Sequence, residues 1–291
     1  MVTNEFKLRI LDALKDARSN FGGSDAKFAI SIGINAAQWS RIKNGEVDKI
    51  LSDANWISLA RTYNVQLRQE REWKTAKTPV YEFIMHQLTM AQQESGSLLL
   101  CDIADIGKTY CARIYAATNL NAVYVDCSQV KSKQKLVRHI AKLYGCGYNG
   151  RYSDVYADLV FYLRSIQNPM VILDEAGDLN YEAFLELKAL WNATERCCGW
   201  CMMGADGLKE KMRRSIEFKK VGYTELFSRY GSRYQKITPD GSDELRKFAR
   251  LQAALIIKAN APTDTADVQK IIMKTDGSLR RIYNELSKLS A

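Results

Sequence analysis

The chain has 291 residues, 46% of them hydrophobic, so it can form two or three compact units with buried cores. Its formal net charge of +9 indicates a surface that a polyanion could neutralise, with nucleic acid ahead of an acidic membrane as the partner; a moderately basic soluble protein is the alternative. No apolar run approaches the roughly 18 residues of a membrane span and the N-terminus lacks a signal-peptide core, so we expect a cytoplasmic protein with no membrane partner.

The cysteines indicate a reducing compartment. Seven of them are scattered over segments that read as strands and helices, and an odd, scattered set does not suit a disulfide framework. The cluster CCGWC at 197–201 contains one CxxC motif, with no second CxxC and neither His86 nor His139 nearby in sequence. We therefore expect these thiols to pack in a core rather than to bind zinc.

The first region, residues 1 to about 68, reads as a helical domain because it contains no strand-like apolar run. Within it, SDAKFAIS at 24–31 predicts a helix, and IGIN at 32–35 interrupts that helix. The following AAQWSRIKNG predicts a second helix with Gly45 as its C-cap. The expected order is helix, tight turn, helix.

This second helix has the two faces that a DNA recognition helix needs. Ala37, Trp39 or Ile42 can face inward, while polar side chains can meet bases and phosphates from the other side. The stretch resembles a helix-turn-helix of the lambda-repressor type, with WSRIKNG and WISLARTYNV as the matching phrases. The resemblance implies DNA binding, and a protein-interaction or oligomerisation module is the alternative. The expected DNA contacts are Gln38, Arg41 and Lys43.

A linker and a leading helix are expected over residues 69–95. The stretch QLRQEREWKTAKTP at 66–79 is polar and charged and ends at Pro79, which is typical of a linker that is helical in part.

The region from 96 to 238 alternates apolar runs of strand length with amphipathic helical stretches. Such runs suit strands that are buried on both faces, and the alternation predicts βαβ units around a parallel sheet. The runs are SLLLCD at 97–102, AVYVDC at 122–127, PMVILDE at 169–175 and GWCMMG at 199–204. The remainder, 239–291, returns to helices alone and predicts a small helical lid. Its first apolar stripe at helical spacing consists of Leu245, Phe248, Leu251 and Leu255.

Gly107, Lys108 and Thr109 follow the first strand and precede a helix, which is the context of a P-loop. In such a loop, backbone N–H groups surround the β-phosphate, the lysine neutralises the β and γ oxygens, and the threonine hydroxyl binds magnesium. We expect Lys108 and Thr109 to take these roles toward ATP and Mg²⁺. The expected nucleotide-binding residues are Asp105, Ile106, Gly107, Lys108, Thr109 and Tyr110.

The loop departs from the full GxxxxGK[ST] pattern at two positions. Asp102 stands where the first glycine should be, and Asp105 occupies a position that is also often glycine in such ATPases. Aspartate tolerates left-handed backbone better than most residues, so the loop shape can survive. A negative charge near a triphosphate opposes binding, so we expect weak or slow nucleotide use, with a dead site as the alternative.

A second acidic motif supports the nucleotide site. The apolar residues 170–173 lead into Asp174 and Glu175, so a buried strand delivers two acids to its C-terminal end. Asp174 can hold magnesium through water, and Glu175 can orient and deprotonate the water that attacks the γ-phosphate. The alternative is a pair of acids that cap a helix starting near Asp178.

The phrases LCDIADIGKT, MVILDEAG and WCMMGADGL resemble the AAA+ superfamily. The resemblance implies a P-loop ATPase whose active site is completed between subunits of a homo-oligomer. It implies a sensor-1 residue after the fourth strand, where only Asp206 could serve. It places an arginine finger in LFSRYGSRYQKI, at Arg229 or Arg233, with a solvated basic turn as the alternative. It also implies a sensor-2 arginine in DGSLRRIYNEL, with Arg280 ahead of Arg281.

The phrases YVDCSQVKSK, RYGSR and GSLRRI, together with the N-terminal helices, resemble the transposition target-selection ATPases typified by the phage Mu B protein, IstB and TnsC. That resemblance implies ATP-dependent polymerisation as a filament on duplex DNA and recruitment of a transposase. Cations and donors near the second strand suit phosphate contacts, although any single lysine can instead be a solvated helix residue. The expected contacts are Ser128, Lys131, Lys133 and Arg151.

Three functions remain open from the residues alone. The first is an ATP-controlled DNA-binding ATPase of a mobile element. The second is a DNA-binding regulator with a degenerate nucleotide site, which Asp102 and Asp105 favour. The third is a replication-initiator or helicase-loader ATPase, which would share nearly every catalytic feature with the first.

Overall fold

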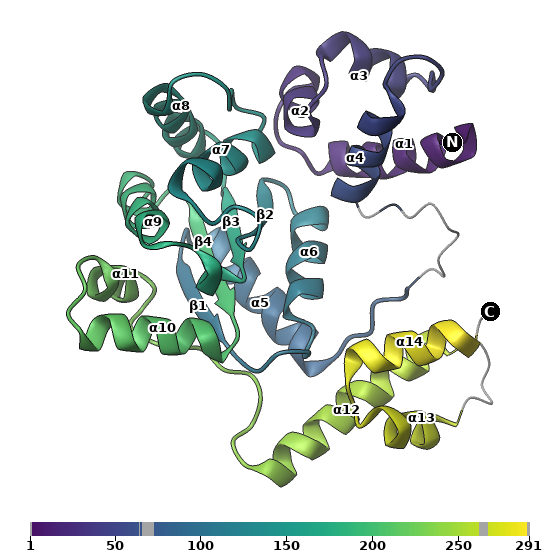
Figure 1. The fold of residues 1–291 in the computed structure, drawn as a ribbon, viewed down its shortest axis with the longest axis vertical. Helices are drawn as coiled ribbons and strands as arrows, with labels where there is room; N and C mark the ends of the chain where they lie inside the picture. Colours follow the sequence, from purple (N-terminus) through teal and green to yellow (C-terminus); the bar gives the residue numbers. More distant parts are fainter. Residues whose placement is uncertain (1, 64, 66–72, 262–266, 290–291) are drawn as a thin grey trace.

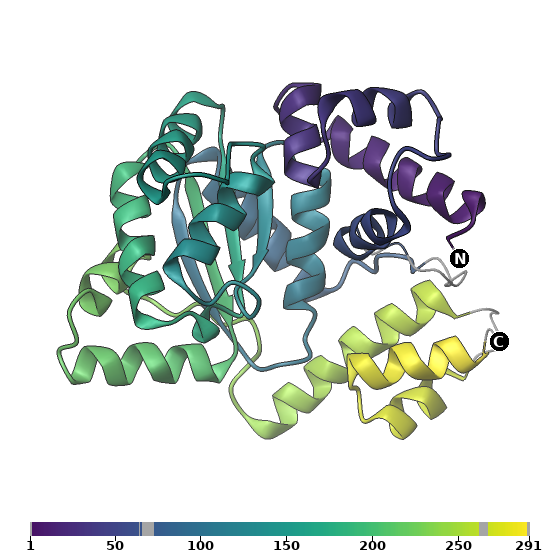
Figure 2. The same cartoon turned by 45° about the horizontal axis from the view of Figure 1, so that its top comes forward.

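The computed structural model describes residues 2–63, 65, 73–261 and 267–289. The chain forms a helical N-terminal unit, an α/β core and a C-terminal group of helices (Figures 1 and 2). Within the described residues, no helix combines the length and apolar character needed to cross a membrane.

The N-terminal unit consists of helices with well-defined ends. Ser24 accepts a hydrogen bond from the Lys27 N–H at the start of the second helix, and Gly33 ends that helix in a left-handed conformation, with φ of 77°. Asn35 and Gln38 form a capping box at the start of the third helix, which fixes the turn between the two. The helices are α1 (Asn4–Ser19), α2 (Asp25–Ile32), α3 (Ala36–Lys43) and α4 (Asp53–Thr62).

A separate apolar core holds these helices together. Trp39 and Ile42 of α3 are buried in it beside Phe28 and Trp56. Ala37, which was a third candidate for the inner face of α3, is exposed instead. The inner face of α3 is therefore carried by one aromatic and one aliphatic side chain at i, i+3 spacing.

The core contains a four-stranded parallel sheet in the order β1-β4-β3-β2. Its strands lie where the apolar runs predict them, at β1 (Ser97–Cys101), β2 (Ala122–Asp126), β3 (Met170–Asp174) and β4 (Gly199–Gly204). All residues of β3 and β4 are buried, as expected for strands covered on both faces. The sequence did not predict Gln235, which extends the sheet beside β1: its N–H donates to the Leu99 carbonyl at 2.8 Å.

Helices cover the sheet on both faces, so alternate residues of one strand enter different cores. Leu99 packs with one set of helices and Leu98 with the other. The first face carries α7 (Lys133–Leu143), α8 (Tyr152–Ser165), α9 (Tyr181–Ala193), α10 (Asp206–Glu217) and α11 (Tyr223–Arg229), and the second carries α5 (Pro79–Gln93) and α6 (Lys108–Thr118). A short 3₁₀ helix, η1 (Ala176–Asp178), follows β3.

The C-terminal group comprises α12 (Ser242–Asn260), α13 (Val268–Thr275) and α14 (Leu279–Leu289), with a small core of its own. The buried face of α12 is not the apolar stripe seen in the sequence. Leu251 of that stripe is exposed, whereas Ala253, Ile257 and Asn260 are buried. Asn260 is buried because its amide is hydrogen-bonded to the backbone of Lys74.

The linker expected over 66–79 is only partly within the described residues, because 66–72 lie outside them. Residues 73–78 form no helix, and α5 begins directly at Pro79. Proline is favoured at the first position of a helix, and Thr78 caps the same end through its hydroxyl.

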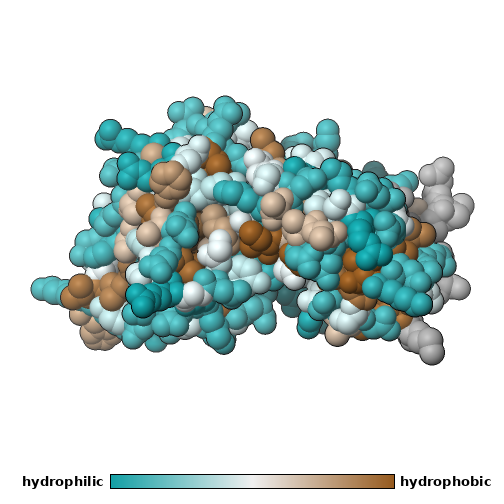
Figure 3. All heavy atoms as spheres, turned by 90° about the horizontal axis from the view of Figure 1, so that it is seen from above, coloured by the Kyte–Doolittle hydropathy of each residue, from teal (hydrophilic) through white to brown (hydrophobic). Residues whose placement is uncertain are grey.

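The N-terminal unit lies against α7 and α8 of the core (Figure 1). The Lys27 ammonium of α2 lies 3.6 Å from the centre of the Tyr162 ring, a cation–π contact. Gly145, just beyond α7, approaches the backbone of Lys27 so closely that an added Cβ would lie 2.2 Å from the Lys27 carbonyl oxygen. The face seen from above is mostly hydrophilic, with hydrophobic residues scattered over it (Figure 3).

The contact at Gly145 predicts an effect of Gly145→Ala on docking of the N-terminal unit. A methyl group meets backbone there, and φ of +68° disfavours alanine, so we expect a loss of about 1–3 kcal/mol in docking free energy. Hydrogen–deuterium exchange should then rise in α2 and in α7. Gly147→Ala is the matched control, because an added Cβ at that glycine meets nothing within 4 Å. Equal exchange in the two variants would contradict the prediction.

Candidate nucleotide site

The P-loop connects β1 to α6 at the carboxyl edge of the sheet. Gly107 adopts φ of 99° immediately before α6 begins at Lys108, and Asp105 adopts φ of 63°. The loop thus passes twice through left-handed backbone, once at a glycine and once at an aspartate, which tolerates it. Ile106, between them, is buried and fixes the loop to the core.

Lys108 lies inside this loop. Its ammonium donates to the carbonyl oxygens of Asp102, at 2.8 Å, and Ile103, at 2.6 Å. Burial lowers the pKa of Lys108, and the carboxylates of nearby acids oppose that shift. Because its present partners are neutral carbonyls, phosphate oxygens would be stronger partners for the same ammonium.

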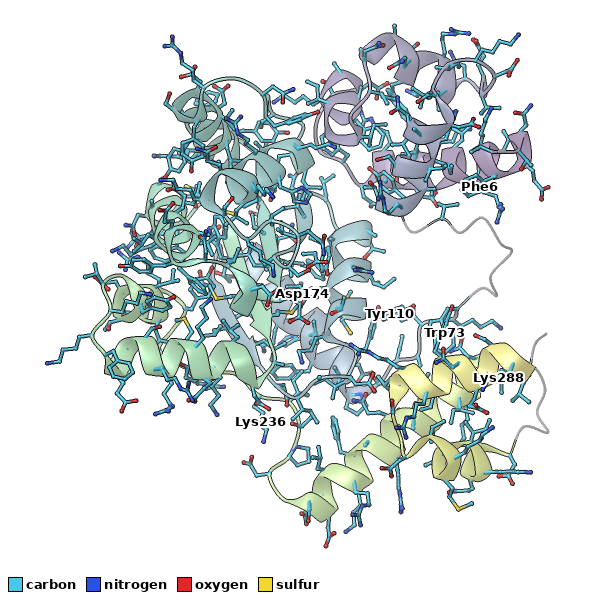
Figure 4. The ribbon with its side chains drawn as sticks, viewed as in Figure 1. Phe6, Trp73, Tyr110, Asp174, Lys236 and Lys288 are labelled. Atoms are coloured by element: carbon cyan, nitrogen blue, oxygen red, sulfur yellow. The ribbon has the colours of Figure 1, made fainter. Side chains whose placement is uncertain are left out.

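Thr109 and Asp174 come together although they are far apart in sequence. The Thr109 hydroxyl donates to Asp174 Oδ2 at 2.7 Å, and the Tyr124 hydroxyl donates to the same oxygen at 3.0 Å. A hydroxyl beside a carboxylate fits Mg²⁺, which is usually held by one or two protein oxygens together with phosphate and water. Figure 4 shows Asp174 at the end of the strands, facing α6.

Glu175 follows Asp174 in a left-handed conformation, with φ of 49°. This backbone turn directs it away from the strand, and its side chain is exposed. Partial loss of water around the carboxylate of this otherwise exposed residue, and then the charge of Asp174, raise the pKa of Glu175, while Lys108 opposes the shift. A raised pKa makes this carboxylate a stronger base toward a water molecule.

Asp102 does not have the environment that its place in the loop suggested. Its carboxylate is buried and accepts hydrogen bonds from the N–H of Ile103, Ile237 and Thr238 and from the Thr238 hydroxyl, at 2.5–2.8 Å. Burial alone would raise the pKa of Asp102, but these hydrogen bonds outweigh it and hold the pKa below its usual value. The expected opposition to a triphosphate is therefore offset at this residue, because four donors compensate the charge.

These hydrogen bonds predict that Asp102→Asn destabilises the core. Asparagine keeps one acceptor and turns an NH₂ group toward N–H donors, so we expect the free energy of unfolding to fall by about 2–4 kcal/mol at pH 7. Because the pKa of Asp102 is lowered in the folded chain, its stabilisation exists above the unfolded pKa of about 3.9 and disappears as the pH falls through the folded value. The difference from the wild type should shrink accordingly in acid.

Urea unfolding followed by circular dichroism measures this difference. Asp240→Asn is the control, because the Asp240 side chain is 97% exposed and its ion pair with Lys236 should contribute about 0–1 kcal/mol. Similar losses in both variants would mean that the Asp102 contacts stabilise nothing.

The start of α14 lies against the P-loop. The Ser278 hydroxyl donates to Asp105 Oδ2 at 2.7 Å, and the Arg280 N–H donates to Asp105 Oδ1 at 3.2 Å. The Arg280 guanidinium is 3.8 Å from the same carboxylate, and its side chain is 85% exposed. Arg281 is also exposed, with its N–H directed to Ser278. Of the two sensor-2 candidates, Arg280 is thus the one in contact with the loop.

The linker also reaches this site, which the sequence did not predict. Thr75 and Tyr110 share a hydrogen bond of 2.6 Å between their hydroxyls, next to the P-loop. The Trp73 ring lies 5.1 Å from the Tyr283 ring of α14. Figure 4 shows Trp73 and Tyr110 between α6 and the C-terminal helices. No local motif marks Trp73, Thr75 or Tyr124, because their partners are remote in sequence.

The two arginine-finger candidates lie at and just after the end of α11, a helix that is on the other side of the core from α6 (Figures 1 and 2). Arg229 is the last residue of α11, and Arg233 comes two residues before Gln235, which pairs with β1. Arg229 donates to Asn192 Oδ1 at 2.6 Å and to its own helix at the Glu225 carbonyl. Arg233 is exposed and makes no hydrogen bond or ion pair through its side chain within the described part of the chain. Asp206 is exposed in the first turn of α10 and makes no hydrogen bond with Asp174 or Glu175.

The candidate DNA contacts of α3 differ in the partners that their side chains already have. Gln38 is occupied, because its carbonyl oxygen accepts from the Asn35 N–H and its amide donates to the Ile50 carbonyl. Arg41 and Lys43 are exposed and paired with Glu46 and Asp25, each at 2.9 Å. Gln38 therefore does not project freely from the helix as predicted, because both ends of its amide are hydrogen-bonded to backbone of the same domain.

The second set of DNA candidates surrounds α7. Lys131 and Lys133 are paired with Asp178 and Glu182, at 3.1 and 3.8 Å. Ser128 donates to Asp126 at 2.6 Å, and Arg151 is exposed at the start of α8. These residues belong to the α/β core, whereas Gln38, Arg41 and Lys43 belong to the N-terminal unit, which packs on α7 through α2.

Comparisons with known proteins bear on the family and the fold of the chain. Residues 90–212 match a family model described as an AAA domain. Among solved structures, the chain is similar to "Structure of the Aeropyrum pernix Orc1 protein in complex with DNA", with a TM-score of 0.52 and 17% identity. The match covers 76% of this chain and 61% of the Orc1 chain, and at this identity it shows the fold alone. A search of curated protein sequences gives no match.

The fold and the site therefore define a P-loop protein with a parallel sheet flanked by helices. More particularly, the fold is that of AAA+ proteins, as the sequence predicts, and the family match lies within residues 90–212.

Proposed function

We propose that the chain is an ATP-dependent DNA-binding AAA+ ATPase that oligomerises on duplex DNA and serves as a transposition target-selection and transposase-activating protein. The observation that carries the ATPase part is the hydrogen bond between Thr109 and Asp174. It joins the two halves of a nucleotide site across 65 residues of sequence.

The roles of the residues follow from their positions. Lys108 exchanges its two carbonyl partners for β and γ oxygens of ATP, and Thr109 and Asp174 hold Mg²⁺. The metal, when bound, neutralises charge on the phosphates. Glu175 orients the attacking water and accepts its proton, and its raised pKa suits that task.

An active site completed between subunits would use the exposed side chain of Arg233. This arginine makes no side-chain hydrogen bond or ion pair with the described residues of its own chain, so it is available to the nucleotide of a neighbour. Arg229 is held by Asn192 and lies 5.4 Å from the Trp191 ring, which favours a structural role. Arg233 is therefore the arginine finger, and Arg229 supports the segment that carries it.

DNA binding is supported by charge. Every charged side chain between Asp126 and Asp154 is basic, and this segment includes α7. The ion pairs of Lys131 and Lys133 are exposed, and exposed pairs contribute about 0–1 kcal/mol, so phosphates can replace their partners at little cost. Arg41 and Lys43 of α3 can exchange partners in the same way. Such contacts give affinity rather than sequence choice.

The role in transposition rests on the sequence phrases that resemble the target-selection group. A replication-initiator or helicase-loader function is the second candidate, favoured by the fold similarity to a structure named as Orc1 in complex with DNA. The two functions differ in the protein that the ATPase acts on. A transposase that is stimulated by the ATP-bound protein supports the first function, and loading of a helicase supports the second.

The first test combines ATP hydrolysis with sedimentation, with and without duplex DNA. We expect DNA-stimulated turnover and large complexes that form only with ATP. Glu175→Gln should still bind ATP but turn over at least about 100-fold more slowly, because it lacks the base. DNA binding that ignores ATP, with turnover no better than Glu175→Gln, would identify a regulator with a relic site instead.

The second test concerns the arginine finger. Arg233→Ala should lower turnover by about 10³-fold and spare ATP binding by the monomer, whereas Arg229→Ala should have a smaller effect. Lys108→Ala should be inactive by itself. Mixing the Arg233→Ala and Lys108→Ala proteins should restore part of the activity, because intact Arg233 then meets an intact P-loop at mixed interfaces. An inactive mixture would contradict a role in trans.

A further inference from the structure

The P-loop contains an acid, Asp105, whose side chain is hydrogen-bonded to the start of α14. Asp105 lies in left-handed backbone at φ of 63°, and both of its carboxylate oxygens accept hydrogen bonds from residues at the start of α14. Nothing about the shape of the loop requires this acid, since glycine adopts the same backbone more easily. The contacts to α14 are what distinguish it from glycine.

These contacts give α14 its N-terminal cap. The first N–H groups of a helix lack partners within the helix, and a carboxylate is favoured at that end by the helix dipole. Asp105 accepts the Arg280 N–H, and Ser278, which donates to Asp105, also accepts the Arg281 N–H. The first turn of α14 is therefore capped from the P-loop. Leu279 packs here too, 3.8 Å from the place of a Cβ on Gly107.

We propose that Asp105 is a positioning residue that fixes the first turn of α14, and with it Arg280, beside the phosphate end of the P-loop. This inference rests on the proposed function of the nucleotide site. The backbone N–H of Arg280 is hydrogen-bonded to Asp105. Its guanidinium makes a looser contact, 3.8 Å from the Asp105 carboxylate, and its side chain is 85% exposed. The guanidinium is thus free to turn to a γ-phosphate while the helix start stays in place.

The same carboxylate has two opposite effects on the reaction. Its charge near the phosphates weakens ATP binding, and its hydrogen bonds place the arginine that assists turnover. Removal of the side chain should therefore lower the KM for ATP and also lower kcat. A residue with a purely structural role would not produce this split.

Three variants separate charge from position. Asp105→Gly keeps the backbone and removes both effects, so we expect ATP to bind about fivefold more tightly and kcat to fall about tenfold. Asp105→Asn removes the charge but can still accept the Arg280 N–H, so it should bind more tightly with kcat near the wild-type value. Ser278→Ala removes one hydrogen bond without changing the charge at the loop, so kcat should fall with affinity unchanged.

Asp276→Asn is the matched control. Asp276 also lies in left-handed backbone near the start of α14, it is exposed, and its side chain makes no hydrogen bond or ion pair within the described residues. Its substitution should leave both constants unchanged.

Hydrogen–deuterium exchange of the 279–283 segment provides a readout that does not depend on hydrolysis. Exchange should be faster in Asp105→Gly and Ser278→Ala than in the wild type, Asp105→Asn and Asp276→Asn. If exchange and kcat are the same in Asp105→Gly as in the wild type, the positioning role is overturned. If the wild type neither binds nor hydrolyses ATP while exchange changes as expected, the proposed function fails but the cap remains.

Discussion

The nucleotide site depends on the register of a parallel sheet. β2 and β3 are paired so that Asp126 lies beside Asp174, and the carboxyl ends of β1 and β3 open on the same edge. The P-loop leaves one of these ends and the acidic pair leaves the other, so the Thr109–Asp174 hydrogen bond can close between them. A slip of one residue in β3 would turn Asp174 toward the opposite face and separate the two halves.

The sequence predicts what is local and periodic. Four buried strands are recognisable as continuous apolar runs, and the P-loop and the acidic pair are recognisable because each is contiguous. The contacts of Asp102 with Thr238, of Asp105 with Ser278 and of Tyr124 with Asp174 were not predicted. Each joins residues that are distant in sequence, and a single sequence contains no pattern that pairs them. The buried face of α12 was missed for a related reason, because Asn260 is buried by a polar partner in the linker.

The charged residues of the molecule have two kinds of partner. Both P-loop acids have hydrogen-bond partners from elsewhere in the chain: Asp102 accepts from four donors, and Asp105 accepts from the start of α14. Conversely, Lys131 and Lys133 near α7, like Arg41 and Lys43 of α3, are paired with exposed acids. Buried charges with several hydrogen bonds are costly to separate, whereas exposed pairs exchange partners easily. The acids thus fix the fold, and the exposed cations stay exchangeable.

The close contact at Gly145 also bears on any assembly of the core. Because the backbone of Lys27 in α2 leaves no room for a single methyl group at Gly145, just beyond α7, the N-terminal helices keep this orientation on the α/β core for as long as that contact holds. Copies of the core related by a screw axis would then display α3 at one constant rise and rotation. The spacing of these helices along a bound duplex would then be set by the rise and rotation between neighbouring cores. It could match the helical pitch of DNA only if that rise and rotation match it.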